Sequence, residues 1–202
     1  MDQPKNDSAI VILAAGGSTR LGTPKQLLKY NGESLLQRAI NTAKGSEAGK
    51  VILVLGASHQ KIISETDIRG TDLVVNPDWQ RGMSSSIVSG IKALKELAPV
   101  PSSVILMVCD QPFVTSTLLD TLIAEHRSTG NQIIACAYES VTGTPVLFHS
   151  TLYDQLLSLE GDAGAKKIIM ANAEKVATVT FELGATDVDT LDEYKSLINK
   201  TS

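Results

Sequence analysis

A short segment near the start of the chain combines three glycines with two cationic side chains. Residues 13–25 have the sequence LAAGGSTRLGTPK and follow directly after an apolar run. Glycines let the backbone bend with its N–H groups turned inward, and such a nest suits phosphate oxygens. Arg20 and Lys25 add two positive charges to the same turn. The segment therefore predicts a loop that binds the phosphates of a nucleoside triphosphate.

Two familiar phosphate-binding motifs share these glycines but differ in spacing. In a P-loop the lysine directly follows the second glycine, and a metal-binding hydroxyl comes next. Here Lys25 lies three residues after Gly22, and Gln26 follows it. The dinucleotide-binding pattern GxGxxG is absent as well. The alternative interpretation is a tight strand-to-helix turn whose charges are solvated.

Carboxylates follow later apolar runs and are suited to holding a metal ion. Asp110 comes just after the run 104–108, and Mg²⁺ takes only one or two protein oxygens when a triphosphate supplies others. Asp187 and Asp189 alternate, so an extended backbone would point both to one side, toward a metal held by Asp110. The alternatives are that Asp110 caps a turn before Pro112, and that the later pair places negative charge at a helix N-terminus.

A serine cluster follows a glycine in the segment 76–86, NPDWQRGMSSS. Gly82 and the three serines present backbone amides and hydroxyls that suit a base edge or an oxygen anion. Simple capping of the following helix is the alternative, although capping needs only one serine. Trp79 is expected to pack rather than to stack on a base.

Short buried strands are expected to position these residues. Continuous apolar runs are typical of strands covered on both faces, and they occur at 10–14, 51–55, 73–75, 104–108, 133–137, 146–148 and 176–181. Segments with helical spacing lie between most of them. This alternation predicts an α/β layered fold with a mostly parallel sheet. Ligands of such sheets bind beyond the carboxyl ends of the strands.

Capping signals predict where several helices begin. Ser34 with Gln37, and Thr190 with Glu193, have the spacing of a capping box. Such pairs satisfy two backbone donors of the first turn. The other expected N-caps are Ser84, Ser85, Ser86 and Asp162.

The composition is that of a globular protein with one core. The 202 residues are 43% hydrophobic and 20% charged, which predicts a single domain over 1–202. A net charge of −4 argues against a nucleic-acid or membrane-surface binder. Residues 1–9 are polar and lack the basic-then-apolar order of a secretory signal, and residues 1–8 are expected to form a disordered tail. Two cysteines without a CxxC pair, with Cys109 assigned to the core, fit the reducing cytoplasm.

Six motifs taken together resemble the molybdenum cofactor cytidylyltransferase family of MocA/MobA-like NTP transferases: LAAGGSTRLGTPKQLL, NPDWQRGMSSSI, CDQP, GTPVLF, GDAGA and DVDTLDEY. The similarity spans nearly the whole chain. It implies a three-layer Rossmann-like nucleotidyltransferase fold of the nucleotide-diphospho-sugar transferase type. It also implies transfer of CMP from CTP to the phosphate of molybdopterin, with Mg²⁺ as cofactor and release of pyrophosphate. Transient contact with a molybdenum hydroxylase or its maturation factor is a further implication.

The resemblance assigns roles to residues at matching positions. Arg20, Lys25 and Asp110 are the implied catalytic residues. Asp110, with Asp189 or Asp187, is the implied metal site. The implied nucleotide contacts are Leu13, Ala14, Ala15, Gly16, Gly17, Ser18, Arg20, Lys25, Gly82, Ser84, Ser85 and Asp110. The implied acceptor contacts are Gly143, Thr144, Pro145, Gly161, Asp162 and Gly164.

The chain departs from the family pattern at a few positions. Thr144 stands where members that act on the cytidine form often carry a histidine, and Leu191 replaces a frequent proline. Ala15, where related guanylyltransferases have glycine, favours cytosine over guanine. The alternative functions are guanylyl or other nucleotidyl transfer to a different phosphate acceptor, and a non-catalytic cofactor carrier for a molybdenum hydroxylase.

Overall fold

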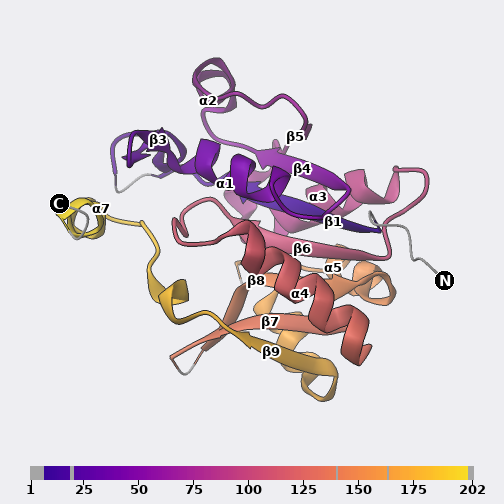
Figure 1. The fold of residues 1–202 in the computed structure, drawn as a ribbon. Helices are drawn as coiled ribbons and strands as arrows, with labels where there is room; N and C mark the ends of the chain where they lie inside the picture. Colours follow the sequence, from indigo (N-terminus) through magenta and orange to yellow (C-terminus); the bar gives the residue numbers. More distant parts are fainter. Residues whose placement is uncertain (1–6, 19–20, 140, 163, 200–202) are drawn as a thin grey trace.

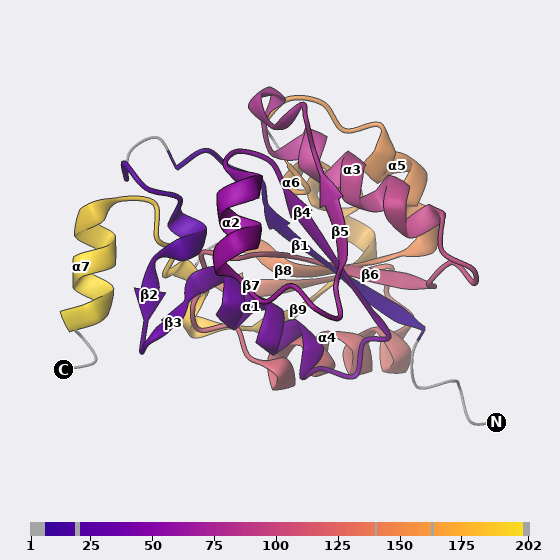
Figure 2. The same cartoon turned by 90° about the horizontal axis from the view of Figure 1, so that it is seen from above.

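A seven-stranded sheet runs through the middle of the molecule in the order β5-β4-β1-β6-β8-β7-β9 (Figure 1). The computed structural model describes residues 7–18, 21–139, 141–162 and 164–199. Figure 2 shows α1 and α4 on one side of the sheet and α3, α5 and α6 on the other. The predicted α/β fold with a mostly parallel sheet and three layers is therefore confirmed.

The strands of the sheet are β1 (Ser8–Ala14), β4 (Lys50–Leu55), β5 (Asp72–Val75), β6 (Ser103–Val108), β7 (Ile133–Tyr138), β8 (Val141–His149) and β9 (Val176–Thr180). The helices are α1 (Leu35–Lys44), α2 (His59–Glu65), α3 (Met83–Lys95), α4 (Ser116–Thr129), α5 (Tyr153–Leu157), α6 (Lys166–Ala171) and α7 (Leu191–Asn199). A small hairpin pairs β2 (Lys29–Tyr30) with β3 (Glu33–Ser34). Short 3₁₀ turns are η1 (Lys25–Leu27), η2 (Trp79–Arg81), η3 (Ser150–Leu152), η4 (Ala173–Lys175) and η5 (Glu182–Ala185).

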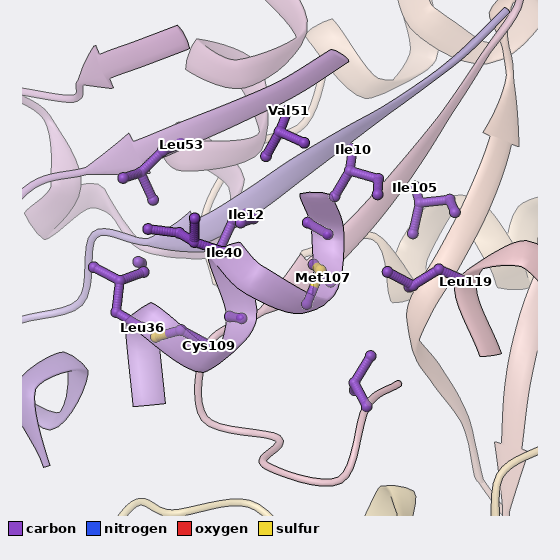
Figure 3. Close-up of a cluster of buried hydrophobic side chains, with 14 of the residues drawn as sticks. Ile10, Ile12, Leu36, Ile40, Val51, Leu53, Ile105, Met107, Cys109 and Leu119 are labelled. Carbon is purple, nitrogen blue, oxygen red and sulfur yellow. The ribbon is translucent and has the colours of Figure 1, made fainter. Parts of the chain in front are cut away.

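The central strand, β1, is buried along its whole length. It pairs in parallel with β4 and β6, and its side chains alternate between the two faces of the sheet. Ile10 and Ile12 pack in one core cluster, whereas Val11 and Leu13 pack in the other. Figure 3 shows the first cluster, to which α1 and β6 contribute Leu36, Ile40, Ile105 and Met107. An unbroken apolar run at 10–14 thus marks a strand with a core on each side.

Both predicted capping boxes satisfy backbone donors of their helices. Ser34 Oγ accepts the Gln37 N–H at 3.1 Å at the start of α1. Before α7, Glu193 Oε2 accepts the Thr190 N–H at 2.7 Å, and Thr190 Oγ1 accepts the Glu193 N–H at 3.3 Å. The second pair is reciprocal, as a full capping box requires. It fixes the entry to α7 directly after Asp189.

The other predicted N-caps are wrong. The residue before α3 is Gly82, whose φ of +93° favours glycine and which has no capping side chain. Ser84 and Ser86 lie inside the first turn of α3 and are buried. The residue before α6 is Ala165, so Asp162 does not cap that helix either. In both places the backbone path into the helix, rather than a side chain, sets its start.

Burial falls off at both edges of the sheet, where the prediction of strands covered on both faces is wrong: no residue of β9 is fully buried, and the same holds for β5. In β5, Val74 packs against the core, but Leu73 and Val75 on the opposite face are 38% and 41% exposed. The apolar run could not reveal this difference, because it does not show which strands lie at the edge of the sheet.

The expected disordered tail at 1–8 is too long, because Ser8 is buried as the first residue of β1. Residues 1–6 lie outside the part of the chain that the structure describes. Among the described residues, no helix has the length and apolar character needed to cross a bilayer.

β8 runs antiparallel to both of its neighbours and is the exception in the sheet. Its Val146 pairs with Leu106 near the end of β6. Because the strands run in opposite directions, the first half of β8, 141–145, lies at the edge where β1 and β6 end. The segment 143–145 of β8 thereby reaches the side of the sheet that carries the glycine-rich loop.

Candidate active site

A pocket at the carboxyl ends of β1 and β6 brings the glycine-rich loop together with Asp110. The two strands are parallel neighbours, so the segments that leave them emerge side by side. The start of α3 closes the third side. The lining residues are Leu13, Ala14, Ala15, Gly16, Gly17, Lys25, Gln26, Trp79, Gln80, Gly82, Met83, Ser86, Val108, Cys109 and Asp110. Open α/β sheets bind their ligands at this edge.

Lys25 links three distant parts of the chain. Its Nζ donates to Asp189 Oδ1 at 2.8 Å and also to Asp110 Oδ2. The Lys25 and Asp110 side chains are only 18% and 13% exposed. Burial by itself would lower the pKa of Lys25, but the two carboxylates outweigh burial and raise this pKa well above its usual value. The lysine therefore keeps its charge throughout the physiological pH range.

One carboxylate oxygen of Asp110 has no hydrogen-bond partner among the described residues. Oδ2 contacts Lys25, whereas this oxygen, Oδ1, is buried. Leaving such an oxygen unpaired costs free energy, so the position suits an incoming cation or donor. The second carboxylate comes from Asp189, which is 40% exposed. Within the described residues Lys25 pairs with Asp189 and not with Asp187.

The segment between η5 and α7 carries Asp189 across the end of β6. Val188 donates its N–H to the Asp110 carbonyl at 3.2 Å and is itself fully buried. The Tyr194 hydroxyl donates to the Lys29 carbonyl at 2.8 Å, which ties α7 to the β2–β3 hairpin. Figures 1 and 2 both show α7 beside this hairpin. Packing at Val188 and Tyr194 thus holds the second carboxylate in place.

Gln26 shapes the glycine-rich loop, a role that the sequence analysis missed. Its side chain is completely buried, and Nε2 donates to the Ala14 carbonyl at 2.7 Å and to the Gly16 carbonyl at 3.0 Å. In a trans peptide the N–H points away from the carbonyl. The N–H groups of Ala15 and Gly17 are therefore turned away from Gln26. The only signal in the sequence was a polar residue next to Lys25 at the start of a buried turn.

We expect Gln26→Leu to lower the free energy of unfolding by about 2 kcal/mol or more, because two loop carbonyls lose their donor. Urea denaturation measures this change. Gln37→Leu is the matched control, since the Gln37 amide bonds at the surface of α1, and it is expected to cost under about 0.5 kcal/mol. Equal losses in the two variants would show that Gln26 has no special role in the loop.

Trp79 forms one wall of the pocket. A Cβ placed on Gly17 would lie 2.8 Å from Trp79 Cζ3, and one on Gly56 would lie 2.6 Å from Trp79 Cβ. The side chain therefore packs on backbone that follows β1 and β4, which confirms the packing role predicted for it. It also lines the pocket, so a ligand there would touch it.

The structure brings only part of the serine segment to the pocket. Gly82 and Ser86 line it, whereas Ser84 and Ser85 do not. Ser84 is 1% exposed. The Ser85 hydroxyl donates to the Gly82 carbonyl at 2.8 Å and accepts from Asn76 Nδ2 at 2.9 Å. The Ser85 hydroxyl thus supports the turn before α3, whereas the buried Ser84 hydroxyl has no hydrogen-bond partner among the described residues. The predicted contact of these two serines with the nucleotide stays a prediction.

The six predicted acceptor residues lie in two segments beside the pocket rather than in its lining. One segment is in β8 and contains Gly143, Thr144 and Pro145. The other packs against the start of α3, where the Gly161 carbonyl accepts the Ser84 N–H at 3.3 Å. Asp162 and Gly164 of this second segment lie against Gly82 and Met83, which line the pocket.

Three further residues singled out in the sequence have different outcomes. Arg20 lies outside the residues that the structure describes. Ser18 Oγ accepts the Lys25 N–H at 2.8 Å, so it braces the loop from within. Cys109 is buried, and burial raises the pKa of its thiol to about 12. Its predicted place in the core is confirmed, and its thiol stays protonated at neutral pH.

Comparison with known proteins agrees with this geometry. The family model of the MobA-like NTP transferase domain matches residues 10–176. Nicotine blue oxidoreductase from Paenarthrobacter nicotinovorans is 31% identical, over 93% of this chain and 95% of that protein.

Two solved structures also resemble the chain. Rv0371C from Mycobacterium tuberculosis H37Rv, in complex with manganese, has a TM-score of 0.79 and 30% identity, covering 95% of this chain and 98% of the other. CMP:2-keto-3-deoxy-manno-octonic acid synthetase complexed with CTP has a TM-score of 0.73 and 14% identity, covering 96% and 99%. The second likeness concerns the fold alone. With the family model matching most of its length, the chain belongs to the MobA-like NTP transferase family and is a nucleotidyltransferase of that family.

Proposed function

We propose that the protein transfers CMP from CTP to the terminal phosphate of molybdopterin. The observation that carries this proposal is the convergence of Asp110 and Asp189 on Lys25, directly beside the glycine-rich loop. Two carboxylates and a lysine at a phosphate-binding nest are the groups that nucleotidyl transfer requires. The choice of acceptor rests on the family motifs, and the choice of cytosine rests on Ala15.

In the proposed reaction a phosphate oxygen of the acceptor attacks the α-phosphorus of CTP. A new P–O bond forms, the bond between the α-phosphorus and the bridging oxygen breaks, and pyrophosphate leaves. Lys25 and the glycine-rich loop hold the departing phosphates, and Arg20 is assigned to the same task. No protein nucleophile is needed, which agrees with the protonated thiol of Cys109.

Asp110 and Asp189 would hold a divalent cation, for which we propose Mg²⁺. The unpartnered Oδ1 of Asp110 supports this fit. In the described part of the chain, no cluster of three His, Cys, Asp or Glu side chains could hold a metal, so phosphate oxygens must complete the ligand set. When bound, the cation neutralises charge on the α-phosphate. The manganese complex of the mycobacterial relative agrees with a divalent ion here.

The partners and location follow from the same proposal. The product would pass to a molybdenum hydroxylase or its maturation factor by transient contact. The net charge of −4 makes nucleic acid an unsuitable partner. Two buried free cysteines suit the reducing cytoplasm, where we place the reaction.

Transfer of label tests the proposal. CTP labelled at the α-phosphate is expected to place its label on molybdopterin when Mg²⁺ is present, while CTP labelled at the γ-phosphate releases labelled pyrophosphate. Label transfer from GTP but not from CTP would show that the transferred group is GMP and not CMP. Binding of molybdopterin without any transfer would favour a non-catalytic carrier.

A separate assay tests for oxidoreductase activity, because one relative is named as an oxidoreductase. Nicotine blue is mixed with the protein and a reduced nicotinamide dinucleotide, and its absorbance is followed. Bleaching that depends on the protein, together with no label transfer, would overturn the proposed nucleotidyl transfer.

A further inference from the structure

The Lys25 ammonium group lies between the two carboxylates to which the proposed function assigns a cation. It contacts Asp110 Oδ2 and Asp189 Oδ1, the latter at 2.8 Å. Lys25 precedes these aspartates by 85 and 164 positions. Only the folded chain assembles this arrangement, and in it a positive charge already offsets part of the negative charge of the two carboxylates.

A divalent cation that takes both carboxylates must compete with this ammonium. The Lys25–Asp110 pair is largely out of water, at 18% and 13% exposure, so separating it without a replacement partner is costly. The carboxylates would gain a new cation, whereas Lys25 would lose both of its anions. The metal alone therefore meets a site in which a built-in competitor is already bound.

A nucleoside triphosphate changes this balance. Lys25 and the loop residues Ala15 to Gly17 line the same pocket, so phosphates held by the loop lie within the reach of the lysine side chain. These phosphates offer Lys25 the anions that it gives up. The carboxylates are then free for a metal that the phosphates also bind.

We propose that Lys25 is an internal counter-ion that blocks the cation site until a nucleoside triphosphate draws it away. Metal and nucleotide then bind cooperatively, and the coupling passes through one side chain. This inference rests on the proposed function for the identity of the site. It differs from a mechanism in which Lys25 stays on the carboxylates and the cation uses Asp110 Oδ1 alone, because that mechanism predicts no competition.

Binding of Mn²⁺ in the absence of nucleotide tests the inference, with the free ion followed by electron paramagnetic resonance. Lys25→Met keeps the length of the side chain and removes its charge. We expect this variant to bind Mn²⁺ at least about tenfold more tightly than the wild type, which corresponds to about 1.4 kcal/mol. Lys95→Met is the matched control, since Lys95 pairs with Asp154 at 2.8 Å on the surface, and its Mn²⁺ affinity should not change.

The factor by which CTP strengthens Mn²⁺ binding gives a second readout. In the wild type, CTP should strengthen Mn²⁺ binding by a larger factor than in Lys25→Met. Unchanged or weaker Mn²⁺ binding in a folded Lys25→Met variant would overturn the inference. If the variant does not fold, the Lys25 side-chain signal of the wild type is followed by nuclear magnetic resonance while CTP is added without metal. A signal that does not move would also overturn it.

These outcomes are separable from those of the proposed function. Mn²⁺ binding without nucleotide requires no turnover. Tighter binding by Lys25→Met together with no label transfer would uphold the counter-ion and reject the reaction. Label transfer by the wild type together with no gain in Lys25→Met would reject the counter-ion alone.

Discussion

Asp110→Asn is expected to lower metal-dependent turnover of CTP by at least about 100-fold. A carboxylate that holds the catalytic cation supports several kcal/mol of transition-state stabilisation, and each 1.4 kcal/mol is worth about tenfold in rate. Asparagine keeps the shape of the side chain but loses the negative charge that Lys25 contacts and that the proposed cation would bind. Steady-state pyrophosphate release measures the change, and circular dichroism confirms that the variant folds.

Asp154→Asn is the matched control for this substitution. Asp154 also pairs with a lysine, but on the surface between α3 and α5, where its side chain is 87% exposed. Its loss is expected to leave turnover within about twofold, as for other exposed ion pairs. Turnover by a folded Asp110→Asn variant that matches the control would remove Asp110 from the reaction.

The second prediction distinguishes Asp189 from Asp187, the two alternatives that the sequence offered for the second carboxylate of the metal site. Asp189→Asn is expected to reduce turnover by about tenfold to 100-fold, because Asp189 shares Lys25 with Asp110. Asp187→Asn is expected to stay within about threefold. The two residues are two positions apart, so each variant is the control for the other. Measuring the metal concentration at half-maximal rate shows whether the loss arises from cation binding.

A reversed order, with Asp187→Asn the more damaging, would mean that the end of the chain rearranges when substrate binds. It would also remove the basis for choosing Asp189, which is its contact with Lys25. Equal and small losses in both variants would leave Asp110 as the sole carboxylate of the site.

Much of the fold could be predicted because its signals are local. The run at 10–14 predicted β1 since burial on both faces excludes polar residues from it. The Thr190–Glu193 spacing predicted the start of α7, because a capping box involves neighbouring residues alone. β5 could not be predicted as partly exposed, since its position at the edge depends on which strands pair. The start of α3 was missed because Gly82 sets it through backbone conformation.

Some residues of the candidate site could likewise be predicted from the sequence, and others could not. Lys25 and Asp110 were identifiable because each follows a strand, and residues after parallel strands gather at one edge of the sheet. The preference for Asp189 over Asp187 required the buried anchor Val188, which directs the chain across β6. Gln26 was missed because nothing in its sequence context shows which carbonyls its amide will meet. Contacts between distant segments are decided by packing, and a single sequence does not display packing.

Pyrophosphate release across the four nucleoside triphosphates shows whether the protein transfers CMP to molybdopterin. The protein is incubated with Mg²⁺ and each nucleotide, with and without molybdopterin, and a parallel set contains a chelator. We predict release with CTP that depends on both molybdopterin and Mg²⁺ and exceeds release with the other three nucleotides. The contradicting result is no release with any nucleotide, although molybdopterin binds to the same preparation.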